Sequence, residues 1–295
     1  MGLLADLAAY GMQRSAPRTA RYGDRLLLDG TDLAEPTALT VPTRRGDVRC
    51  EVYRPRGEPA GTYVHLHGGA FLMRFPRMDD FFARFVAARS GLVVVNVDYD
   101  VAPQVRYPVA QEQAHDVLAW AVRHHDELGV ASDRVAVGGF SAGGNLAAAA
   151  CLQARNLGTV APVAQLLVVP SLDVAEPPRA KVARAPHGMV DTRLLRLVRS
   201  TYFRDAARRG EPYASPLRAP ELSGLPPTMV VTAEHDSLRH EGDAYARRLA
   251  GAGVEVDHVV VPRADHYVLD GDRARAEALM DRMAAHVRGP ARAAH

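Results

Sequence analysis

The pentapeptide Gly139-Phe140-Ser141-Ala142-Gly143 has the residue types and spacing needed to present a serine hydroxyl as a nucleophile. A serine held in a strained turn needs residues with almost no side chain two positions before it and two positions after it, and both positions are glycine here. Residues 134–137 are typical of a strand, and the alanine-rich segment after the motif is typical of a helix. The N-terminus of such a helix favours negative charge that develops nearby. We therefore predict that Ser141 is a nucleophile.

A serine hydroxyl attacks a carbonyl group efficiently only when a neighbouring base takes its proton, and a histidine oriented by a carboxylate is the usual base. The partners are expected after later strands, in the order serine, acid, histidine. Of the 12 histidines, only His266 follows the serine and lies just beyond an expected strand, at residues 258–261. The preceding expected strand, at residues 228–232, leads to Glu234 and Asp236. We predict Asp236 as the acid and keep Glu234 as the alternative.

A tetrahedral oxyanion needs N–H donors that are already in place, and each donor contributes roughly 3–4 kcal/mol in other enzymes. The segment His67-Gly68-Gly69-Ala70 directly follows an expected strand at residues 62–66. Its glycines let backbone N–H groups approach a substrate closely, because they carry no side chain. The expected donors are the N–H groups of Gly68, Gly69, Ala70 and Ala142.

Short apolar runs alternate with helical patterns along the chain and position these motifs. The runs expected to be strands lie at residues 48–53, 62–66, 92–97, 135–137, 164–169, 228–232 and 258–261. The helical patterns lie at about residues 108–128, 142–156, 239–250 and 273–287. Nearly continuous apolar strands that alternate with helices indicate an α/β fold, in which a mostly parallel sheet is covered by helices on both faces.

The alternation stops between about residues 171 and 220, where the apolar spacing indicates a helix and no strand. We predict that this segment, together with about residues 1–45, forms a helical cap over the sheet. The chemical motifs extend from Gly68 to His266 across one sheet. Residues 1–295 are therefore predicted to form a single catalytic domain.

Apolar and aromatic residues near the motifs and in the expected cap are candidates for a substrate pocket. Those predicted to line it are Phe71, Leu72, Phe140, Tyr202, Phe203 and Tyr267. Packing in the core is an equally good explanation for the residues that follow the glycine loop and for those in the cap.

The composition excludes several classes of function. The chain is 47% hydrophobic and 24% charged, with 36 basic and 34 acidic residues and a net charge of +2. Because the two counts are nearly equal, the chain has no excess of positive charge of the kind that binds nucleic acid or an anionic membrane. No apolar run approaches the roughly 20 residues of a membrane helix, and the N-terminus lacks the pattern of a secretory signal. We expect a cytoplasmic protein that acts on a small, neutral or apolar molecule.

Five motifs, in this order and spacing, resemble the hormone-sensitive-lipase-like branch of the α/β-hydrolases, which is bacterial family IV. They are His67-Gly68-Gly69-Ala70, Asp98-Tyr99-Asp100-Val101-Ala102-Pro103, Gly139-Phe140-Ser141-Ala142-Gly143-Gly144, Tyr213-Ala214-Ser215-Pro216-Leu217 and Glu234-His235-Asp236-Ser237-Leu238-Arg239. The likeness covers about residues 48–287. It implies an α/β-hydrolase fold with about eight strands and a helical cap, and a triad of Ser141, Asp236 and His266.

The resemblance also implies carboxylesterase activity on small or medium acyl esters, with no metal or cofactor, and homodimerisation as one option. Two positions depart from the branch. Phe140 stands before the serine where Asp or Thr is usual, and Tyr267-Val268 follow the histidine where a small residue and Phe are usual. These departures concern the substrate and the pocket, and leave the geometry of the nucleophile unchanged.

Two alternatives to a carboxylesterase remain open. The same triad serves an amide deacetylase, a lactonase or an acyltransferase acting on a specialised metabolite, because only the leaving group or the acyl acceptor changes. A ligand-binding homologue without catalysis is the second alternative. Retention of Ser141, Asp236 and His266 together argues against it.

Overall fold

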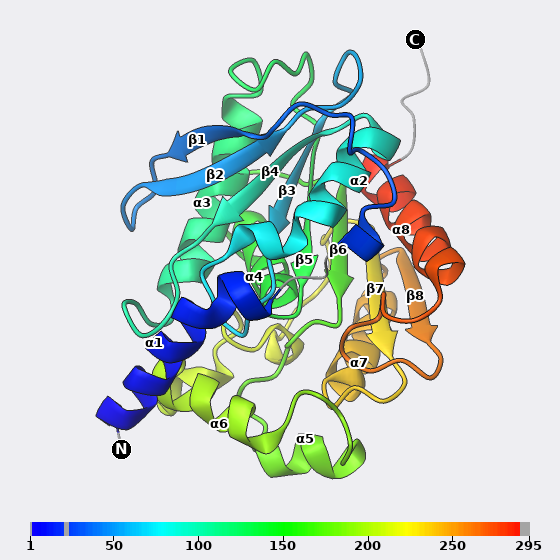
Figure 1. The fold of residues 1–295 in the computed structure, drawn as a ribbon. Helices are drawn as coiled ribbons and strands as arrows, with labels where there is room; N and C mark the ends of the chain where they lie inside the picture. The colour runs from blue at the N-terminus through cyan, green and yellow to red at the C-terminus, as the bar shows by residue number, and fades with distance from the viewer. Residues whose placement is uncertain (1, 21–23, 290–295) are drawn as a thin grey trace.

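The computed structural model of the protein describes residues 2–20 and 24–289. The strands are β1 (Thr37–Val41), β2 (Val48–Tyr53), β3 (Thr62–Leu66), β4 (Val93–Asp98), β5 (Val135–Phe140), β6 (Ala164–Val168), β7 (Thr228–Ala233) and β8 (Val256–Val261). They form one eight-stranded sheet in the order β1-β2-β4-β3-β5-β6-β7-β8 (Figure 1). β2 pairs antiparallel with β1 and β4, and the other neighbours are parallel. The predicted α/β fold with a mostly parallel sheet is confirmed.

Helices cover both faces of the sheet. The α-helices of the described residues are α1 (Gly2–Thr19), α2 (Asp80–Ser90), α3 (Val109–Arg123), α4 (Ala142–Leu157), α5 (Pro178–Arg184), α6 (Thr192–Thr201), α7 (Arg239–Gly251) and α8 (Arg273–Arg288). None of the helices in the described ranges is long and apolar enough to cross a membrane. The predicted domain and cap also include residues 1, 21–23 and 290–295, which lie outside the described residues.

Two buried apolar clusters form the core, one on each face of the sheet. The first contains residues of α3, α4 and α7, and the second contains residues of α2 and α8. Within β4, Val93 and Val95 belong to the first cluster and Val94 to the second, because successive side chains of a strand point to opposite faces. Burial on both faces is the reason that the inner strands have nearly continuous apolar sequences.

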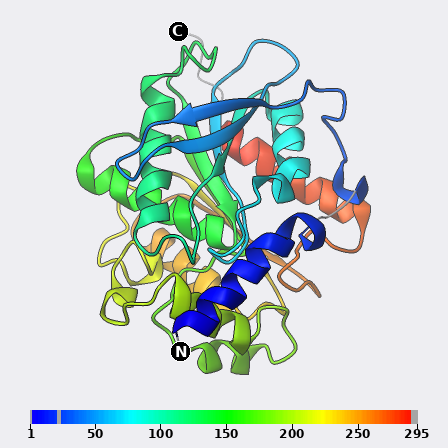
Figure 2. The same cartoon turned by 60° about the vertical axis from the view of Figure 1, so that its left-hand side comes forward.

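The helices α1, α5 and α6 lie at the end of the sheet toward which the arrows of β6, β7 and β8 point (Figure 1). Helix α1 packs against α6, and α6 packs against α5. Figure 2 shows α1 running beside the yellow-green segment that contains α6. An N-terminal helix and a segment from the middle of the chain therefore meet near the ends of the strands that carry the chemical motifs.

Two elements of the fold were not predicted. Strand β1 lies at the edge of the sheet, and most of its residues are exposed or half-buried, so its sequence lacks the apolar run of an inner strand. Helix α2 is buried along eight of its 11 residues, so it has no polar face to reveal a helical period. The expected helix at 108–128 ends at Arg123 in α3, because the following residues form a turn.

Candidate active site

Ser141 lies in the sharp turn between β5 and α4. Its φ is 54°, in the left-handed region that a residue with a side chain rarely adopts. The Ser141 N–H donates to the Val168 carbonyl oxygen at 2.8 Å, and the Ser141 carbonyl oxygen accepts from the N–H groups of Asn145 and Ser171 at 3.2 Å each. These bonds to β6 and to the segment after it stabilise the strained turn and present the hydroxyl at the end of the sheet.

The two glycines of the motif are required by close contact with the end of β3. A Cβ atom at Gly143 would lie 1.8 Å from the carbonyl oxygen of Leu66, and a Cβ atom at Gly139 would lie 2.2 Å from the same oxygen. Both distances are far below van der Waals contact, and the obstacle is backbone. The close approach of the serine turn to the glycine loop after β3 therefore depends on these two glycines.

Replacing Gly143 with alanine should destabilise the fold by more than about 4 kcal/mol, a loss reserved for severe steric or core defects. The matched control is Gly11→Ala in α1, where no atom lies within 4 Å of the added Cβ. Alanine is favoured over glycine inside a helix by roughly 0.5–1 kcal/mol, so the control should be neutral or stabilising. Urea unfolding measures both free energies, and a Gly143→Ala protein as stable as the control would contradict the argument.

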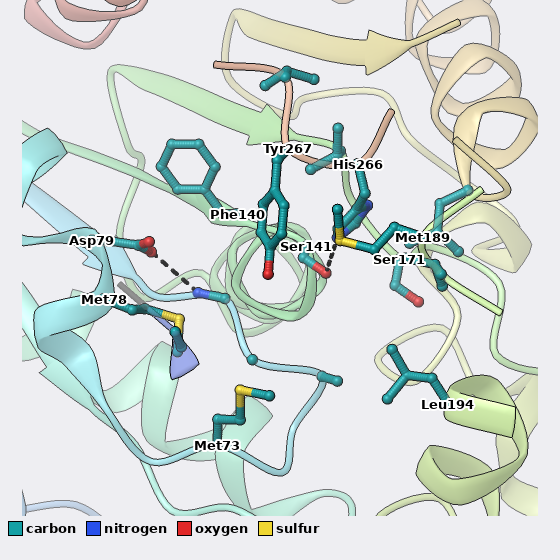
Figure 3. A pocket seen from close by; sticks show the side chains of 18 of the residues that line it. Met73, Met78, Asp79, Phe140, Ser141, Ser171, Met189, Leu194, His266 and Tyr267 are labelled. Carbon is teal, nitrogen blue, oxygen red and sulfur yellow. Dashed lines mark hydrogen bonds between the residues drawn. The ribbon is translucent and has the colours of Figure 1, made fainter. Parts of the chain in front are cut away.

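The structure brings Ser141, His266 and Asp236 together after the ends of β5, β8 and β7. Figure 3 shows the contact between Ser141 and His266. The Nε2 atom of His266 lies 2.9 Å from the Oγ atom of Ser141, and its Nδ1 atom lies 2.8 Å from Oδ2 of Asp236. Asp236 is 1% exposed, and its Oδ1 atom accepts the N–H of Leu238 at 3.0 Å. Glu234, the alternative acid, is exposed and instead accepts the N–H of Arg263 at 2.6 Å.

The carboxylate of Asp236 sets the protonation of His266. Burial lowers the pKa of His266, but the charge and hydrogen bond of Asp236, with smaller contributions from the charges of Asp265 and Glu241, outweigh burial, so the pKa lies above its ordinary value of 6.5. A carboxylate at Nδ1 requires the proton on that nitrogen in the neutral ring. Nε2 then has a free lone pair, which accepts the hydroxyl proton of Ser141.

Backbone groups of the glycine loop after β3 are oriented by buried side chains. The Tyr99 hydroxyl donates to the carbonyl oxygens of His67 and Gly68, at 2.8 and 3.2 Å. Burial lowers the pKa of His67, and its neutral ring donates from Nδ1 to the Gly68 carbonyl oxygen at 2.6 Å. The N–H and C=O groups of a trans peptide point in opposite directions, so the N–H of Gly69 points away from these side chains.

The four N–H groups predicted as oxyanion donors are not equivalent. The N–H of Gly68 donates to Oδ2 of Asp79 at 3.2 Å. The carbonyl oxygen of Gly69 accepts from the N–H groups of Leu72 and Met73, at 2.9 Å each, which leaves the N–H of Ala70 on the opposite side of that peptide. The N–H of Gly68 is therefore already occupied, and the prediction that it is a donor is corrected. Gly69, Ala70 and Ala142 stay the predicted donors.

A cavity of about 280 Å³ opens beside Ser141 and is lined mainly by apolar side chains. Of the predicted pocket residues, Phe71, Phe140 and Tyr267 line it, and Tyr267 is 40% exposed at its edge (Figure 3). Phe140 packs edge to face on Phe82, with ring centroids 5.0 Å apart. The ring beside the serine turn is therefore held by α2 and forms one wall of the cavity.

The prediction that Leu72, Tyr202 and Phe203 line this cavity is wrong. All three are buried in the core cluster on the α3 and α4 face. The ring of Tyr202 stacks on Phe71 at 5.0 Å, and its hydroxyl donates to Oε1 of Gln111 at 2.8 Å. Tyr202 and Phe203 pack on Phe71 from the side away from the cavity. None of the three lines the space beside Ser141.

Several residues that line the cavity were not predicted from the sequence, and they come from distant parts of the chain. They are Met12 of α1, Met78 and Asp79 before α2, Met189 before α6, and Leu194 of α6. They share no spacing or motif, so no pattern in a single sequence could predict that they line the same cavity. In the described ranges, 2–20 and 24–289, no group of three or more His, Cys, Asp or Glu side chains could hold a metal ion.

Comparisons with known proteins agree with this fold. A family model described as alpha/beta hydrolase fold matches residues 63–270. The chain is 34% identical over 259 residues to the carboxylic ester hydrolase LipN of Mycobacterium tuberculosis. The aligned region covers 85% of this chain and 67% of LipN. It is also 34% identical over 235 residues to an ethyl acetate hydrolase of Pseudomonas putida, with 77% of this chain and 74% of that protein covered.

Among solved structures, an esterase from Pyrobaculum calidifontis superposes with a TM-score of 0.88 at 31% identity, covering 96% of this chain and 94% of that one. The fold and the match over most of the chain define the class as that of the α/β hydrolases. The chain belongs to the hormone-sensitive-lipase-like branch of this family, and it is a carboxylic ester hydrolase.

Proposed function

We propose that this protein hydrolyses small or medium acyl esters through a triad of Ser141, His266 and Asp236 and a covalent acyl-enzyme. The observation that carries the proposal is the double contact of His266, 2.9 Å from the Ser141 hydroxyl and 2.8 Å from the Asp236 carboxylate. Both distances are within hydrogen-bond reach, which is the geometric requirement for a nucleophile, a base and its orienting group.

In the first half of the reaction, Nε2 of His266 takes the proton of the Ser141 hydroxyl while Oγ attacks the ester carbonyl carbon. The carbonyl oxygen becomes negative and accepts hydrogen bonds from the N–H groups of Gly69, Ala70 and Ala142. His266 then gives its proton to the departing alkoxide, so the alcohol leaves and the acyl group stays on Ser141.

In the second half, a water molecule takes the place of the alcohol. His266 removes one of its protons, and the oxygen attacks the acyl carbon through a second oxyanion. Collapse of this intermediate returns the proton to Ser141 and releases the carboxylic acid. Asp236 takes no proton in either half: it orients the imidazole ring of His266 and stabilises the imidazolium that forms.

The cavity supports esters of limited size. Its volume of about 280 Å³ lies just below the roughly 300–1,000 Å³ of pockets that enclose drug-sized ligands. Methionine side chains from three segments, Met12, Met78 and Met189, contribute apolar and flexible surface to the lining. We infer an apolar acyl or alcohol group as the part of the substrate that this surface contacts.

We also propose that residues 1–295 form one catalytic domain with a cap from about residues 1–45 and 171–220. Met12 of α1 and Leu194 of α6 line the same cavity as Ser141, and α1 packs against α6. Both segments therefore border the substrate space, which supports their assignment to a cap.

A series of p-nitrophenyl esters from acetate to octanoate tests the substrate class. Burial of one methylene group contributes about 0.8 kcal/mol, so kcat/KM should rise by up to about fourfold per methylene while the chain fits the cavity. It should stop rising once the apolar space is filled. Product analysis with an added alcohol, a lactone and an anilide in parallel separates hydrolysis from the alternative reactions. Absence of turnover across the whole series, with ligand binding retained, would contradict the proposed function.

A further inference from the structure

Three buried polar side chains form a continuous chain beneath the glycine loop. Tyr63 and His65 belong to β3, and Asp79 immediately precedes α2. The Tyr63 hydroxyl lies 3.2 Å from Nδ1 of His65, and Nε2 of His65 lies 3.0 Å from Oδ2 of Asp79. None of the three is more than 2% exposed. A buried carboxylate is costly unless hydrogen bonds stabilise it, so the bonds that Asp79 accepts are the key to its role.

The direction of these hydrogen bonds follows from the groups that can only accept or that keep their proton. Burial raises the pKa of Tyr63 well above its ordinary value of 10.0, so the phenol keeps its proton and can donate it to Nδ1 of His65. A carboxylate oxygen only accepts, so Nε2 of His65 carries a proton and donates it to Oδ2 of Asp79. The carboxylate of Asp79 is therefore held in one orientation by a fixed series of donors.

The same oxygen of Asp79 accepts the N–H of Gly68 at 3.2 Å. The carbonyl oxygen of His67, at the other edge of that peptide, accepts from Tyr99 at 2.8 Å. Since the two groups of a trans peptide point in opposite directions, Asp79 and Tyr99 hold this peptide plane from both edges. The orientation of this plane sets the direction of the chain into Gly69.

The residues that follow need such support. Gly69, Ala70 and Phe71 have φ values of 110°, 57° and 59°, three successive residues in the region that side chains disfavour. Conformations of this kind persist only when surrounding contacts impose them. A hydrogen bond to a charged acceptor is roughly twice as strong as a neutral one, so a carboxylate is a suitable group to hold the beginning of this strained segment.

We propose that Asp79 is a positioning residue for the oxyanion hole. It acts through the N–H of Gly68 and keeps the N–H groups of Gly69 and Ala70 directed at the reacting carbonyl oxygen. The inference rests on the proposed function, because it assigns Asp79 a part in stabilising the oxyanion of that reaction. Its effect belongs to the transition state, where the negative charge develops, and not to binding of the neutral ester.

The test compares Asp79→Ala with Asp80→Ala. Asp80 is the neighbouring carboxylate, but it bonds to Tyr53 at 2.8 Å and Arg84 at 2.9 Å, away from the loop. Loss of a whole oxyanion donor costs about 10²–10³ in kcat. A displaced loop should cost less, so Asp79→Ala should lower kcat by about 10–100-fold with KM within about threefold. Asp80→Ala should keep the wild-type kcat.

The affinity for phenylboronic acid is a second measurement, and it should not change if Asp79 has only a structural role. The tetrahedral adduct of this acid with Ser141 places an oxygen in the oxyanion hole, so its affinity should fall in Asp79→Ala by the same factor as kcat. Asp79→Asn retains an oxygen that can accept from Gly68 and should recover most of both losses. If Asp79→Ala does not fold, Asp79→Leu, which fills the space without an acceptor, should show the same pattern.

Three results have distinct meanings. A kcat and a boronate affinity in Asp79→Ala or Asp79→Leu within twofold of the Asp80→Ala values would overturn the inference. A raised KM with unchanged kcat would also overturn it, because Asp79 would then contact the substrate itself. A wild-type protein that turns over no ester would overturn the proposed function and the inference together.

Discussion

Replacing Ser141 with alanine should lower kcat by about 10⁶-fold, the loss observed when a triad serine is removed elsewhere. The change deletes the Oγ atom that lies 2.9 Å from His266 and leaves the cavity and the backbone donors in place. Binding of the ester should change little, because the ground state needs no covalent bond. Steady-state rates of p-nitrophenyl butanoate hydrolysis by Ser141→Ala and by the wild type measure the loss of kcat.

Ser132→Ala is the matched control for this loss. Ser132 lies just before β5, at the opposite end of the strand from Ser141, and its hydroxyl oxygen accepts the N–H of Arg134 at 3.2 Å. Its replacement removes a serine hydroxyl near the other end of β5 and away from the cavity, so kcat should stay within about twofold of wild type. Comparable activity in the two alanine variants would contradict the role of Ser141.

Asp236→Asn should lower kcat by about 10⁴-fold, because an amide cannot hold the required tautomer of the histidine. It should also change the pH profile. In the wild type, Asp236 raises the pKa of His266 above 6.5, and only the neutral ring accepts a proton, so activity should rise with pH through that higher pKa. Without the carboxylate, burial still lowers the pKa and only the smaller contributions of Asp265 and Glu241 raise it, so the acid limb of kcat/KM should move to lower pH.

Glu234→Gln is the control for this variant, since Glu234 is the other carboxylate after β7. It is exposed and accepts the N–H of Arg263, so its replacement should change kcat by no more than about threefold and leave the acid limb in place. A larger loss of kcat in Glu234→Gln than in Asp236→Asn would contradict the choice of Asp236 and identify Glu234 as the acid.

Much of the candidate site could be predicted from the sequence because its chemical groups lie directly after strands. Ser141 follows β5, Asp236 follows β7 and His266 follows β8. Parallel strands place their C-terminal ends at one edge of the sheet, so residues far apart in the chain must meet there. The requirement for glycine at Gly143 is also local, because it arises from contact with the neighbouring strand β3.

The cavity wall could not be predicted in the same way. Tyr202 and Phe203 look like pocket residues in the sequence but pack behind Phe71, whereas Met189 and Leu194 face the cavity. An apolar residue in a cap has the same sequence signature in either place. Its position depends on how the cap packs against the sheet, which no local pattern records.

Asp79 shows the same limit for a polar residue. Asp79 and Asp80 are adjacent and identical in type, and a single sequence offers no reason to separate them. The fold directs Asp79 toward His65 and the glycine loop, and directs Asp80 toward Tyr53. Only the packing of α2 against the sheet distinguishes a residue that supports the loop from one that supports the edge of the core.

Covalent labelling with a fluorophosphonate tests the central claim most directly. The reagent phosphonylates a serine only where a base and oxyanion donors activate it. The account predicts one adduct per chain, located by peptide mass spectrometry on Ser141, with loss of ester hydrolysis in proportion to labelling and no adduct in Ser141→Ala. A folded wild-type protein that hydrolyses esters while Ser141 stays unlabelled, or that carries the adduct on another residue, would contradict it.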